Sequence, residues 1–356
     1  MNKAIEQLNS LQLEINEHID SFFKTKNQHI QPIAPALSEF VETVHHLCQK
    51  GKRLRAAYVY FGYLASGGND KKKILDLCSS IELIHSYFLI HDDIMDQDVV
   101  RRGMITMHAK YEKIHKTRYK KGSSTHFGES VAIIGGDMAS AFGYDILANS
   151  NFSEKIKIRI LNKMNSLVID TMAGQFLDIK LEVSSKVNKR DIMSVLKYKT
   201  AKYTIEGPLH IGAIAADKNV QKNLNIFSDY AIPLGIAFQI RDDILGIFGS
   251  EEKLGKPVGS DIRENKHTIL IHTAFERANS AQKKVLKNCL GNDNLTKKQI
   301  EDFRQVIVDT GSLDYATKEV DKLLLESLGV IKKANFKKEG KDFLIGIGEY
   351  LVRRES

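Results

Sequence analysis

LDLCSSIELIHSYFLIHDDIMD spans residues 75–96, and the spacing of its apolar residues predicts an α-helix. Leu77, Ile81, Ile84 and Phe88 recur at intervals of 4, 3 and 4 residues, which places them along one helical face. A helix of about 22 residues is roughly 33 Å long. We therefore expect a long, strongly apolar helix that ends in acidic residues.

Helical periodicity continues through the rest of the chain. No proline occurs between residues 36 and 207, so long helices can run there without interruption. Alternating strand patterns are nearly absent, and neither a long flexible linker nor an internal repeat is evident. Further helices are predicted at residues 153–185, 190–206, 222–248 and 297–309, with breaks at 66–70, 121–124, 249–259 and 291–294. The sequence thus predicts one all-α domain spanning residues 1–356.

Length and composition limit the class of protein. The chain has 356 residues, of which 42% are hydrophobic and 27% charged, as in globular proteins. No uninterrupted apolar run approaches the roughly 18 to 20 residues of a spanning helix, so we expect neither a membrane span nor a signal peptide. The cysteines Cys48, Cys78 and Cys289 lack metal-ligand spacing, which suits packing roles and a cytoplasmic location.

The chain is basic, with a formal net charge of +8. Such a charge can serve a nucleic acid, a membrane surface or a small anionic substrate. The densest basic run, at residues 110–121, lacks a known nucleic-acid motif, and a solvated loop or helix face is the favoured explanation. Net charge is therefore informative only if the lysines and arginines converge on a site. A helical nucleic-acid-binding protein remains a minor alternative.

A first acidic cluster lies at the end of the helix at residues 75–96. Asp92 and Asp96 are four residues apart, so their carboxylates project from the same side of successive turns. Mg²⁺ prefers one or two carboxylates together with water and phosphate oxygens. The alternative is a solvated helix end, although acidic residues there oppose the helix dipole and a cation would offset that penalty.

A second acidic pair, Asp242 and Asp243, follows Gln239 in the apolar segment FQIRDDILG. Carboxylates on a mostly apolar helix need a cationic partner because desolvating a lone charge is costly. A structural ion pair with Arg241 would supply one. Two acidic clusters on two apolar helices nevertheless favour a shared site for several metal ions.

Basic residues stand beside glycines or helix ends in several places. Such positions combine backbone N–H groups with cationic side chains, the combination that binds phosphate oxygens. Each place could be ordinary surface on its own. The segments are Gly51-Lys52-Arg53-Leu54-Arg55, Arg101-Arg102-Gly103, Lys199-Thr200, and the pair Lys256 and Lys266.

The motifs together resemble those of the trans-isoprenyl diphosphate synthases, the family of farnesyl and geranylgeranyl diphosphate synthases. The resemblance rests on GKRLRA, HDDIMDQDVVRRG, LKYKTAKYT, FQIRDDILG and GKPVGSDIRENKHT, in this order within residues 45–275. It implies an all-α, single-domain orthogonal helix bundle around a deep central cavity. It also implies a homodimer that uses Mg²⁺, about three ions per active site, with Mn²⁺ as a substitute.

The resemblance also implies a role for each matching residue. The catalytic set comprises Asp92, Asp93, Asp96, Arg101, Lys199, Asp242 and Asp243, and the magnesium ligands among them are Asp92, Asp96 and Asp242. The allylic diphosphate is assigned to Arg101, Lys199, Thr200, Gln239, Lys256 and Lys266. Isopentenyl diphosphate is assigned to Lys52, Arg55, His85 and Arg102. Gln175 and Asp178, which share a helical face with Thr171, are assigned to the cavity wall.

Two details bear on activity and product length. Gly246 stands in DDILG where many members carry a third aspartate, and Asp261 could supply charge nearby. Tyr87 and Phe88 precede the first acidic motif, where bulky residues of this family form the cavity floor. A short product, farnesyl (C15) or geranylgeranyl (C20) diphosphate, is therefore expected. The alternative for Tyr87 is packing against a neighbouring helix.

The expected reaction is ionisation of an allylic diphosphate, followed by head-to-tail (1′-4) condensation with isopentenyl diphosphate. A terpene cyclase of the same fold would need no second diphosphate site at Lys52, Arg55, His85 and Arg102. A non-catalytic subunit of a heteromeric synthase should have lost aspartates from the first motif, and this chain keeps all three. These features favour an active all-trans prenyl diphosphate synthase.

Overall fold

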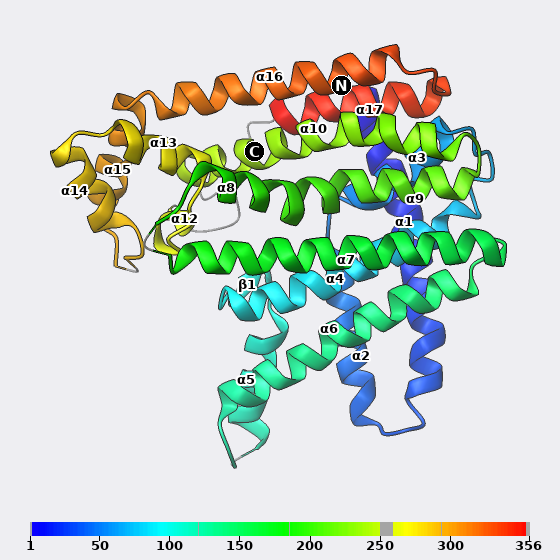
Figure 1. The fold of residues 1–356 in the computed structure, drawn as a ribbon. Coiled ribbons are helices and arrows are strands. Elements are labelled where there is room, and N and C mark those ends of the chain that lie inside the picture. The colour runs from blue at the N-terminus through cyan, green and yellow to red at the C-terminus, as the bar shows by residue number, and fades with distance from the viewer. Residues whose placement is uncertain (1, 120, 185, 250–258, 293, 354–356) are drawn as a thin grey trace. The chain divides into compact units, whose positions relative to one another are not determined.

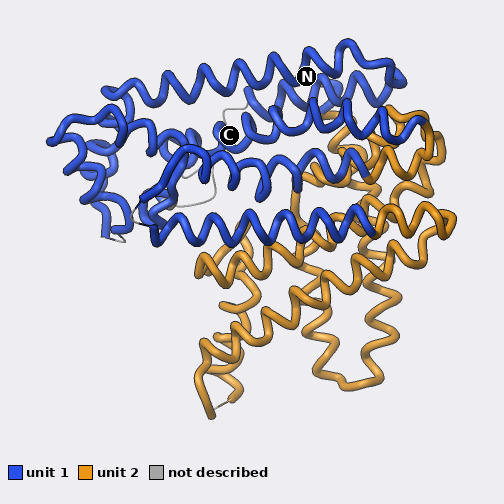
Figure 2. The backbone as a smooth tube through the Cα atoms, viewed as in Figure 1, with its two compact units in different colours: residues 1–4, 162–210, 219–356 blue, residues 5–161, 211–218 orange. Residues whose placement is uncertain are grey.

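The computed structural model consists almost entirely of helices (Figure 1). It describes residues 2–119, 121–184, 186–249, 259–292 and 294–353. Within these residues the chain forms two compact units, coloured separately in Figure 2. Unit 1 comprises residues 1–4, 162–210 and 219–356, and unit 2 comprises residues 5–161 and 211–218. The two units are described one at a time below.

Unit 2 holds the first acidic motif and the upstream basic segment. Three helices, α1, α7 and α9, have residues in both units. In chain order its elements are α1 (Asn2–Ile30), α2 (Ala36–Gln49), α3 (Leu54–Ala65), α4 (Ile74–Met95), β1 (Val100–Arg101), β2 (Met104–Ile105), α5 (Met107–Arg118), α6 (Ser124–Asn149), the start of α7 (Glu154–Glu182) and the end of α9 (Gly207–Ala216).

The core of unit 2 forms around α4. Leu77, Ile81 and Ile84 are fully buried on this helix, as their spacing predicts. Helix α6 approaches α4 closely because glycine stands at the contact: a Cβ at Gly143 would lie 2.9 Å from Ile84 Cγ1 and 3.0 Å from the carbonyl oxygen of Ser80. Burial of these side chains, with the close contact of α6, holds α4 in place and so fixes the acidic end that it carries.

A short hairpin follows the first acidic motif. Strands β1 and β2 are antiparallel, with Arg101 opposite Met104, so Arg102 and Gly103 form a two-residue loop. Both loop residues have positive φ, 53° and 72°, as a type I′ turn requires. Glycine adopts this conformation readily, whereas the arginine is held in it by its surroundings. The hairpin therefore sets the directions of Arg101 and Arg102.

Unit 1 holds the second acidic motif. Helix α16 runs beside α10 (Figure 1), and the Tyr230 hydroxyl of α10 donates to the Leu344 carbonyl oxygen at 2.7 Å. Its elements after α7 are α8 (Lys189–Val195), η1 (Leu196–Glu206), the start of α9, α10 (Val220–Phe248), α12 (Ser260–Arg263), α13 (Ile269–Arg277), α14 (Ser280–Cys289), α15 (Lys297–Asp309), α16 (Ser312–Lys333) and α17 (Lys338–Arg353).

Element η1 is a π-helix, a rare conformation in which each N–H pairs with the fifth preceding carbonyl. Glycines of two neighbouring helices touch its backbone. A Cβ at Gly174 of α7 would lie 2.4 Å from the Lys199 nitrogen, and one at Gly235 of α10 would lie 2.4 Å from the Ala201 Cα. No side chain fits at either contact. We call these contacts the glycine clamp; they hold the wide helical turn that carries Lys199 and Thr200.

The prediction of an all-α protein is confirmed, and the helices predicted at residues 75–96, 153–185, 222–248 and 297–309 match α4, α7, α10 and α15. The segment at residues 190–206 is helical as predicted, but most of it is a π-helix. The hairpin β1–β2 was not predicted. The prediction of a single domain over residues 1–356 stays a prediction, and most of the break predicted at 249–259 lies outside the described residues.

One helix among the described residues, α6, has the length and apolar composition that a membrane span needs. Core helices of soluble proteins meet the same criterion. The Gly143 side of α6 packs on α4 within unit 2, as a core helix would.

Candidate active site

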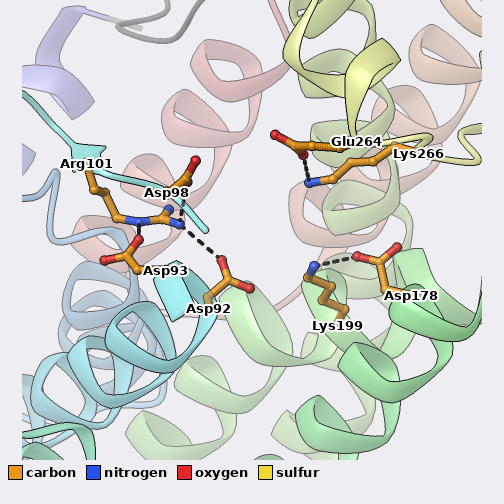
Figure 3. A network of polar contacts seen from close by, with 8 residues as sticks. All are labelled: Asp92, Asp93, Asp98, Arg101, Asp178, Lys199, Glu264 and Lys266. Carbon is orange, nitrogen blue, oxygen red and sulfur yellow. Dashed lines mark hydrogen bonds and ion pairs between the residues drawn. The ribbon is translucent and has the colours of Figure 1, made fainter. Parts of the chain in front are cut away.

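The first acidic motif forms a cluster with Arg101, which we call the aspartate cluster (Figure 3). The Arg101 guanidinium donates to Asp92 Oδ2 at 3.3 Å and to Asp98 Oδ2 at 3.2 Å, and its Nε donates to Asp93. One arginine thus neutralises part of the charge of three carboxylates. The hairpin directs this guanidinium back toward the end of α4.

The carboxylates of this cluster differ in exposure. Asp93 is buried, and burial raises its pKa to about 6, although the Arg101 guanidinium opposes the shift. Asp92 is half-buried, and Asp96 lies at the C-cap of α4, where its N–H donates to the Asp92 carbonyl at 2.8 Å. Asp93 is therefore suited to orienting Arg101, whereas Asp92 and Asp96 have the accessibility that a metal ligand needs.

The upstream basic segment leads into the first turn of α3, and we call residues 51–55 the basic loop. Lys52 is exposed and Arg55 is half-buried, while Arg53 between them is buried. The side chain of Arg102 lies against this loop and donates to the Lys50 carbonyl oxygen. Within unit 2 the hairpin and the basic loop are therefore in direct contact.

His85 lies on α4 among these arginines. Burial lowers its pKa well below the ordinary range, and the guanidiniums of Arg55, Arg102, Arg101 and Arg53 lower it further. The imidazole is consequently neutral at neutral pH. A neutral ring can donate one hydrogen bond to a phosphate oxygen without adding another charge to a crowded basic surface.

Unit 1 contains a pocket beside the π-helix, which we call the lysine pocket. Lys199 Nζ pairs with Asp178 at 2.5 Å, and Lys266 Nζ pairs with Glu264 at 2.9 Å (Figure 3). The polar residues that line it are Asp178, Lys199, Thr200, Gln239, Asp243, Lys266, His267 and Thr268. Lys199 and Lys266 are thus each paired with a carboxylate. An anion that binds in the pocket would replace these partners.

A chain of hydrogen bonds joins the π-helix to the second acidic motif. The Thr200 hydroxyl donates to Gln239 Oε1 at 3.0 Å, and Gln239 Nε2 donates to Asp243 Oδ1 at 3.0 Å. Asp243 is buried, and burial raises its pKa to about 7 despite this hydrogen bond. Asp242, the next residue toward the N-terminus, is half-buried and accessible. The chain of hydrogen bonds therefore fixes Gln239 and Asp243, and the ligand role of Asp242 beside them stays a prediction.

Gly246 and Asp261 share one space in unit 1. A Cβ at Gly246 would lie 2.2 Å from Asp261 Oδ2 and 2.9 Å from its Cγ. The carboxylate of Asp261 therefore lies directly against α10, one turn beyond Asp242. Its charge is close enough to help raise the pKa of the buried Asp243. The segment after α10 thus brings a third carboxylate to the second motif.

The side chains predicted as metal ligands are of the kind that magnesium takes. Asp92, Asp96 and Asp242 offer carboxylate oxygens only, which a hard cation such as Mg²⁺ prefers. Within the residues that the structure describes, no three His, Cys, Asp or Glu side chains gather closely enough to enclose an ion. Mg²⁺ commonly completes its octahedron with water and phosphate oxygens, so such an enclosure is not required.

The predicted residues fall into two groups. Unit 2 brings together Asp92, Asp93, Arg101, Arg102, Arg55 and His85, and unit 1 brings together Asp178, Lys199, Thr200, Gln239, Asp243 and Lys266. The shared metal site of Asp92, Asp96 and Asp242 stays a prediction, because these residues belong to different units. Lys256 lies outside the described residues, and Gln175 is half-buried on α7.

The two aromatic residues before the first motif differ in environment. Tyr87 is buried, its ring centroid is 4.7 Å from that of His91, and Asp137 and Tyr144 of α6 are near its hydroxyl. This is the packing that the alternative interpretation expects. Phe88 is half-buried and contacts the Tyr87 ring at 4.7 Å. A role of Phe88 in product length therefore stays the stronger of the two predictions.

Sequence reasoning missed the residues that orient the charged groups. Asp98 holds Arg101, and Glu264 holds Lys266. Glu82 pairs with the buried Arg53. Asp98 and Glu264 could have been found from the sequence, because Asp98 is three residues from Arg101 and Glu264 is two residues from Lys266. Glu82 stands alone among apolar residues of its helix. A buried carboxylate at such a position needs a cationic partner from elsewhere in the chain, and that was the signal for it.

Comparisons with known proteins agree with these motifs. A family model described as polyprenyl synthetase matches residues 38–307. The geranylgeranyl diphosphate synthase of Sulfolobus acidocaldarius is 31% identical over 95% of this chain and 97% of its own length. The geranylfarnesyl diphosphate synthase of Aeropyrum pernix is 30% identical, over 88% of this chain and 93% of its own.

A solved structure is similar along the whole chain. Geranylgeranyl pyrophosphate synthase from Corynebacterium glutamicum, complexed with isoprenyl diphosphate and magnesium, aligns with a TM-score of 0.92 and 30% identity. The alignment covers 98% of this chain and 99% of that one.

Proposed function

This chain belongs to the polyprenyl synthetase family, and from that premise we propose that it condenses isopentenyl diphosphate with an allylic diphosphate. The product is a short all-trans prenyl diphosphate. The observation that carries the proposal is that each unit holds its own cationic set, the basic loop with His85 in unit 2 and the lysine pocket in unit 1. A reaction between two diphosphates needs two such sets.

The cofactor that we propose is Mg²⁺, about three ions per active site, with Mn²⁺ as a substitute. Magnesium would supply charge neutralisation of the departing pyrophosphate, held by Asp92, Asp96 and Asp242. The Corynebacterium structure, which contains magnesium and an isoprenyl diphosphate, supports this choice. Asp93 and Asp243 assist as buried neighbours that hold Arg101 and Gln239.

The allylic diphosphate is the substrate that ionises. Arg101, Lys199 and Lys266 exchange their present carboxylate partners for phosphate oxygens, and Thr200 and Gln239 donate further hydrogen bonds. Lys256 is assigned to the same diphosphate by the motif alone. These cations favour breaking the bond between the allylic carbon and oxygen, because they stabilise the charge that develops on pyrophosphate.

Isopentenyl diphosphate is the second substrate. Lys52, Arg55 and Arg102 bind its diphosphate, and the neutral His85 donates one hydrogen bond. The double bond of this substrate attacks the allylic cation, and released pyrophosphate then accepts the proton. Apolar walls, with Gln175 and Asp178 near the diphosphate end, exclude water that would quench the cation.

Two rival functions remain distinguishable. A terpene cyclase would not need the basic loop, His85 and Arg102 as a second anion site. A non-catalytic subunit would not need the complete aspartate cluster. A direct assay separates all three: purified protein is incubated with Mg²⁺, isopentenyl diphosphate and a C5, C10 or C15 allylic diphosphate.

We expect longer prenyl diphosphates, with geranylgeranyl (C20) favoured over farnesyl (C15) because of the relatives' names. Cyclic hydrocarbons formed without isopentenyl diphosphate would favour the cyclase. Absence of any product from each primer would contradict the proposed function.

Product length is expected to depend on the residue one turn before Asp92. Phe88→Ala should lengthen the product by one or more C5 units, because a shorter side chain opens space for the growing hydrocarbon tail. Tyr87→Ala should lengthen it less, since Tyr87 packs toward α6, and the double variant should act at least as strongly as Phe88→Ala. Chromatography of the dephosphorylated products measures the length. Active, folded variants with unchanged products would place the cavity floor on another helix.

We also propose a cytoplasmic homodimer that is neither membrane-integrated nor bound to nucleic acid. The support is an exposed apolar face on α7 within unit 1. Ile169 and Phe176 are 66% and 67% exposed, Val183 just beyond the helix is 83% exposed, and Met172 and Ile179 complete the same face. Residues at intervals of three and four align on one side of a helix, and a second copy would bury them.

The dimer is testable by sedimentation velocity. Phe176→Glu should convert a dimer into a monomer at micromolar concentration, because it would bury a charge in the apolar contact. Leu325→Glu on α16 is the matched control, since Leu325 is 69% exposed but lies outside the α7 face. A parent protein that sediments as a monomer, or a Phe176→Glu variant that stays dimeric, would contradict this interface.

A further inference from the structure

The residue at the centre of the basic loop points away from its neighbours. Lys52 is exposed and Arg55 half-buried, whereas only 3% of Arg53 is exposed. Arg53 also has a left-handed backbone, with φ of 53° and ψ of 33°. A non-glycine residue keeps this conformation only when its surroundings hold it there. The contacts of the Arg53 side chain explain why its backbone keeps the left-handed conformation.

Three different segments hold the Arg53 guanidinium. Its NH1 lies 3.3 Å from Glu82 Oε2 of α4, and its Nε donates to Asn16 Oδ1 of α1 at 2.9 Å. Its NH2 donates to the Cys48 carbonyl oxygen at the end of α2 at 2.5 Å. Both charged groups of the ion pair are buried, with 2% and 3% of the side chains exposed. Buried charges of this kind persist only when paired and hydrogen-bonded.

The second oxygen of Glu82 holds the start of α3. The Ala56 N–H, in the first turn of that helix, donates to Glu82 Oε1 at 3.0 Å. The side chain of Arg53, the N-cap residue, does not accept a hydrogen bond from the first turn of α3. A carboxylate at a helix N-terminus is favoured by the helix dipole as well. Glu82 therefore fixes both the inward arginine and the helix that carries Arg55.

The same loop is held at its other end. Gln12 Nε2 donates to the Gly51 carbonyl oxygen at 2.6 Å, and the Arg102 guanidinium contacts Gly51 and the Lys50 carbonyl oxygen. His85 lies one turn after Glu82 on α4, among Arg55, Arg102, Arg101 and Arg53. Glu82 thus places a buried negative charge beneath a surface of converging cations.

We infer that Arg53 and Glu82 are positioning residues: their buried ion pair fixes the basic loop so that Lys52 and Arg55 can bind the diphosphate of isopentenyl diphosphate. This inference rests on the proposed function. Neither residue touches the substrate in this scheme. The pair acts by holding the loop backbone and by offsetting the repulsion among the neighbouring cations.

The test is a comparison of two Michaelis constants. Glu82→Gln preserves the size of the side chain and removes its charge, and Arg53→Lys preserves the charge but loses the branched guanidinium. Each variant should raise KM for isopentenyl diphosphate by about tenfold or more, while kcat and KM for the allylic substrate change by less than about threefold. Glu39→Gln is the matched control, because it breaks an exposed Arg–Glu pair with Arg118 in the same unit.

Asn16→Ala provides a milder variant if the buried substitutions fail to fold. It removes one hydrogen bond to Arg53 from a half-buried position on α1 and should raise the same KM by about threefold. Folded variants with an unchanged KM for isopentenyl diphosphate would overturn the inference. Equal increases of both Michaelis constants would overturn it too, since they would indicate a general structural role.

A binding measurement separates this inference from the proposed function. Titration calorimetry with isopentenyl diphosphate alone should give weaker binding to Glu82→Gln than to the parent. If the parent condenses nothing but binds isopentenyl diphosphate more tightly than Glu82→Gln does, the proposed function fails and the positioning role stands. If the parent condenses the substrates and Glu82→Gln binds isopentenyl diphosphate equally well, the positioning role fails alone.

Discussion

Asp92→Ala or Asp96→Ala is expected to lower kcat by at least about a hundredfold, which corresponds to roughly 3 kcal/mol of transition-state stabilisation. Both carboxylates are accessible at the end of α4, and both are oxygen ligands of the kind that Mg²⁺ takes. Neither substitution creates a core cavity, so the melting temperature should change little. Steady-state kinetics across Mg²⁺ concentrations measures the effect.

Two controls make this result specific. Asp137→Ala removes a carboxylate of the same unit whose side chain is 67% exposed on α6, and it should leave kcat nearly unchanged. Chelation of divalent ions should abolish the parent activity, and added Mg²⁺ or Mn²⁺ should restore it. Full turnover of the Asp92→Ala or Asp96→Ala variant, or of the chelated parent, is incompatible with the metal assignment.

Lys199→Ala is expected to impair use of the allylic substrate, lowering its kcat/KM by about a hundredfold, because a desolvated lysine–phosphate contact is lost. Lys52→Ala or Arg55→Ala should instead mainly raise KM for isopentenyl diphosphate. The two sets of cations would then separate kinetically. Initial rates with one substrate varied and the other saturating give the four constants required.

Lys202 offers a matched control on the same π-helix. It pairs with Asp170 at 2.6 Å, as Lys199 pairs with Asp178 at 2.5 Å, and their side chains are 24% and 26% exposed. Lys202 does not line the lysine pocket. Lys202→Ala should therefore retain kcat/KM for both substrates. If Lys199→Ala affects both substrates equally, the division of roles is wrong.

The long helices were predictable because their apolar spacing matches the helical period. Leu77, Ile81 and Ile84 are buried as that spacing requires. The π-helix was not predictable from this signal, since its residues carry no separate pattern; backbone contacts at Gly174 and Gly235 accompany it. The hairpin was missed because its strands have only two residues each, too few to show alternation.

The sequence identified most residues of the candidate site, but it did not show which of them form ion pairs with one another. The motifs identified Asp92, Arg101 and Lys199, yet the sequence could not show that Arg101 contacts three carboxylates within its own unit. Glu82 and Arg53 are 29 residues apart in sequence and meet only through packing of α3 on α4. Long-range ion pairs of this kind depend on tertiary structure, which no local pattern records.

The glycine clamp has a consequence for how this sequence can diverge. Gly174 and Gly235 face backbone atoms of the π-helix at distances that no side chain can tolerate. Backbone atoms, unlike the tip of a flexible side chain, cannot rotate away from an added methyl group. Both positions should therefore stay glycine across homologues even though neither glycine has a functional group. The two glycines are thus constrained by backbone contact alone, whereas Lys199, which lies between them in the sequence, is constrained by what its side chain binds.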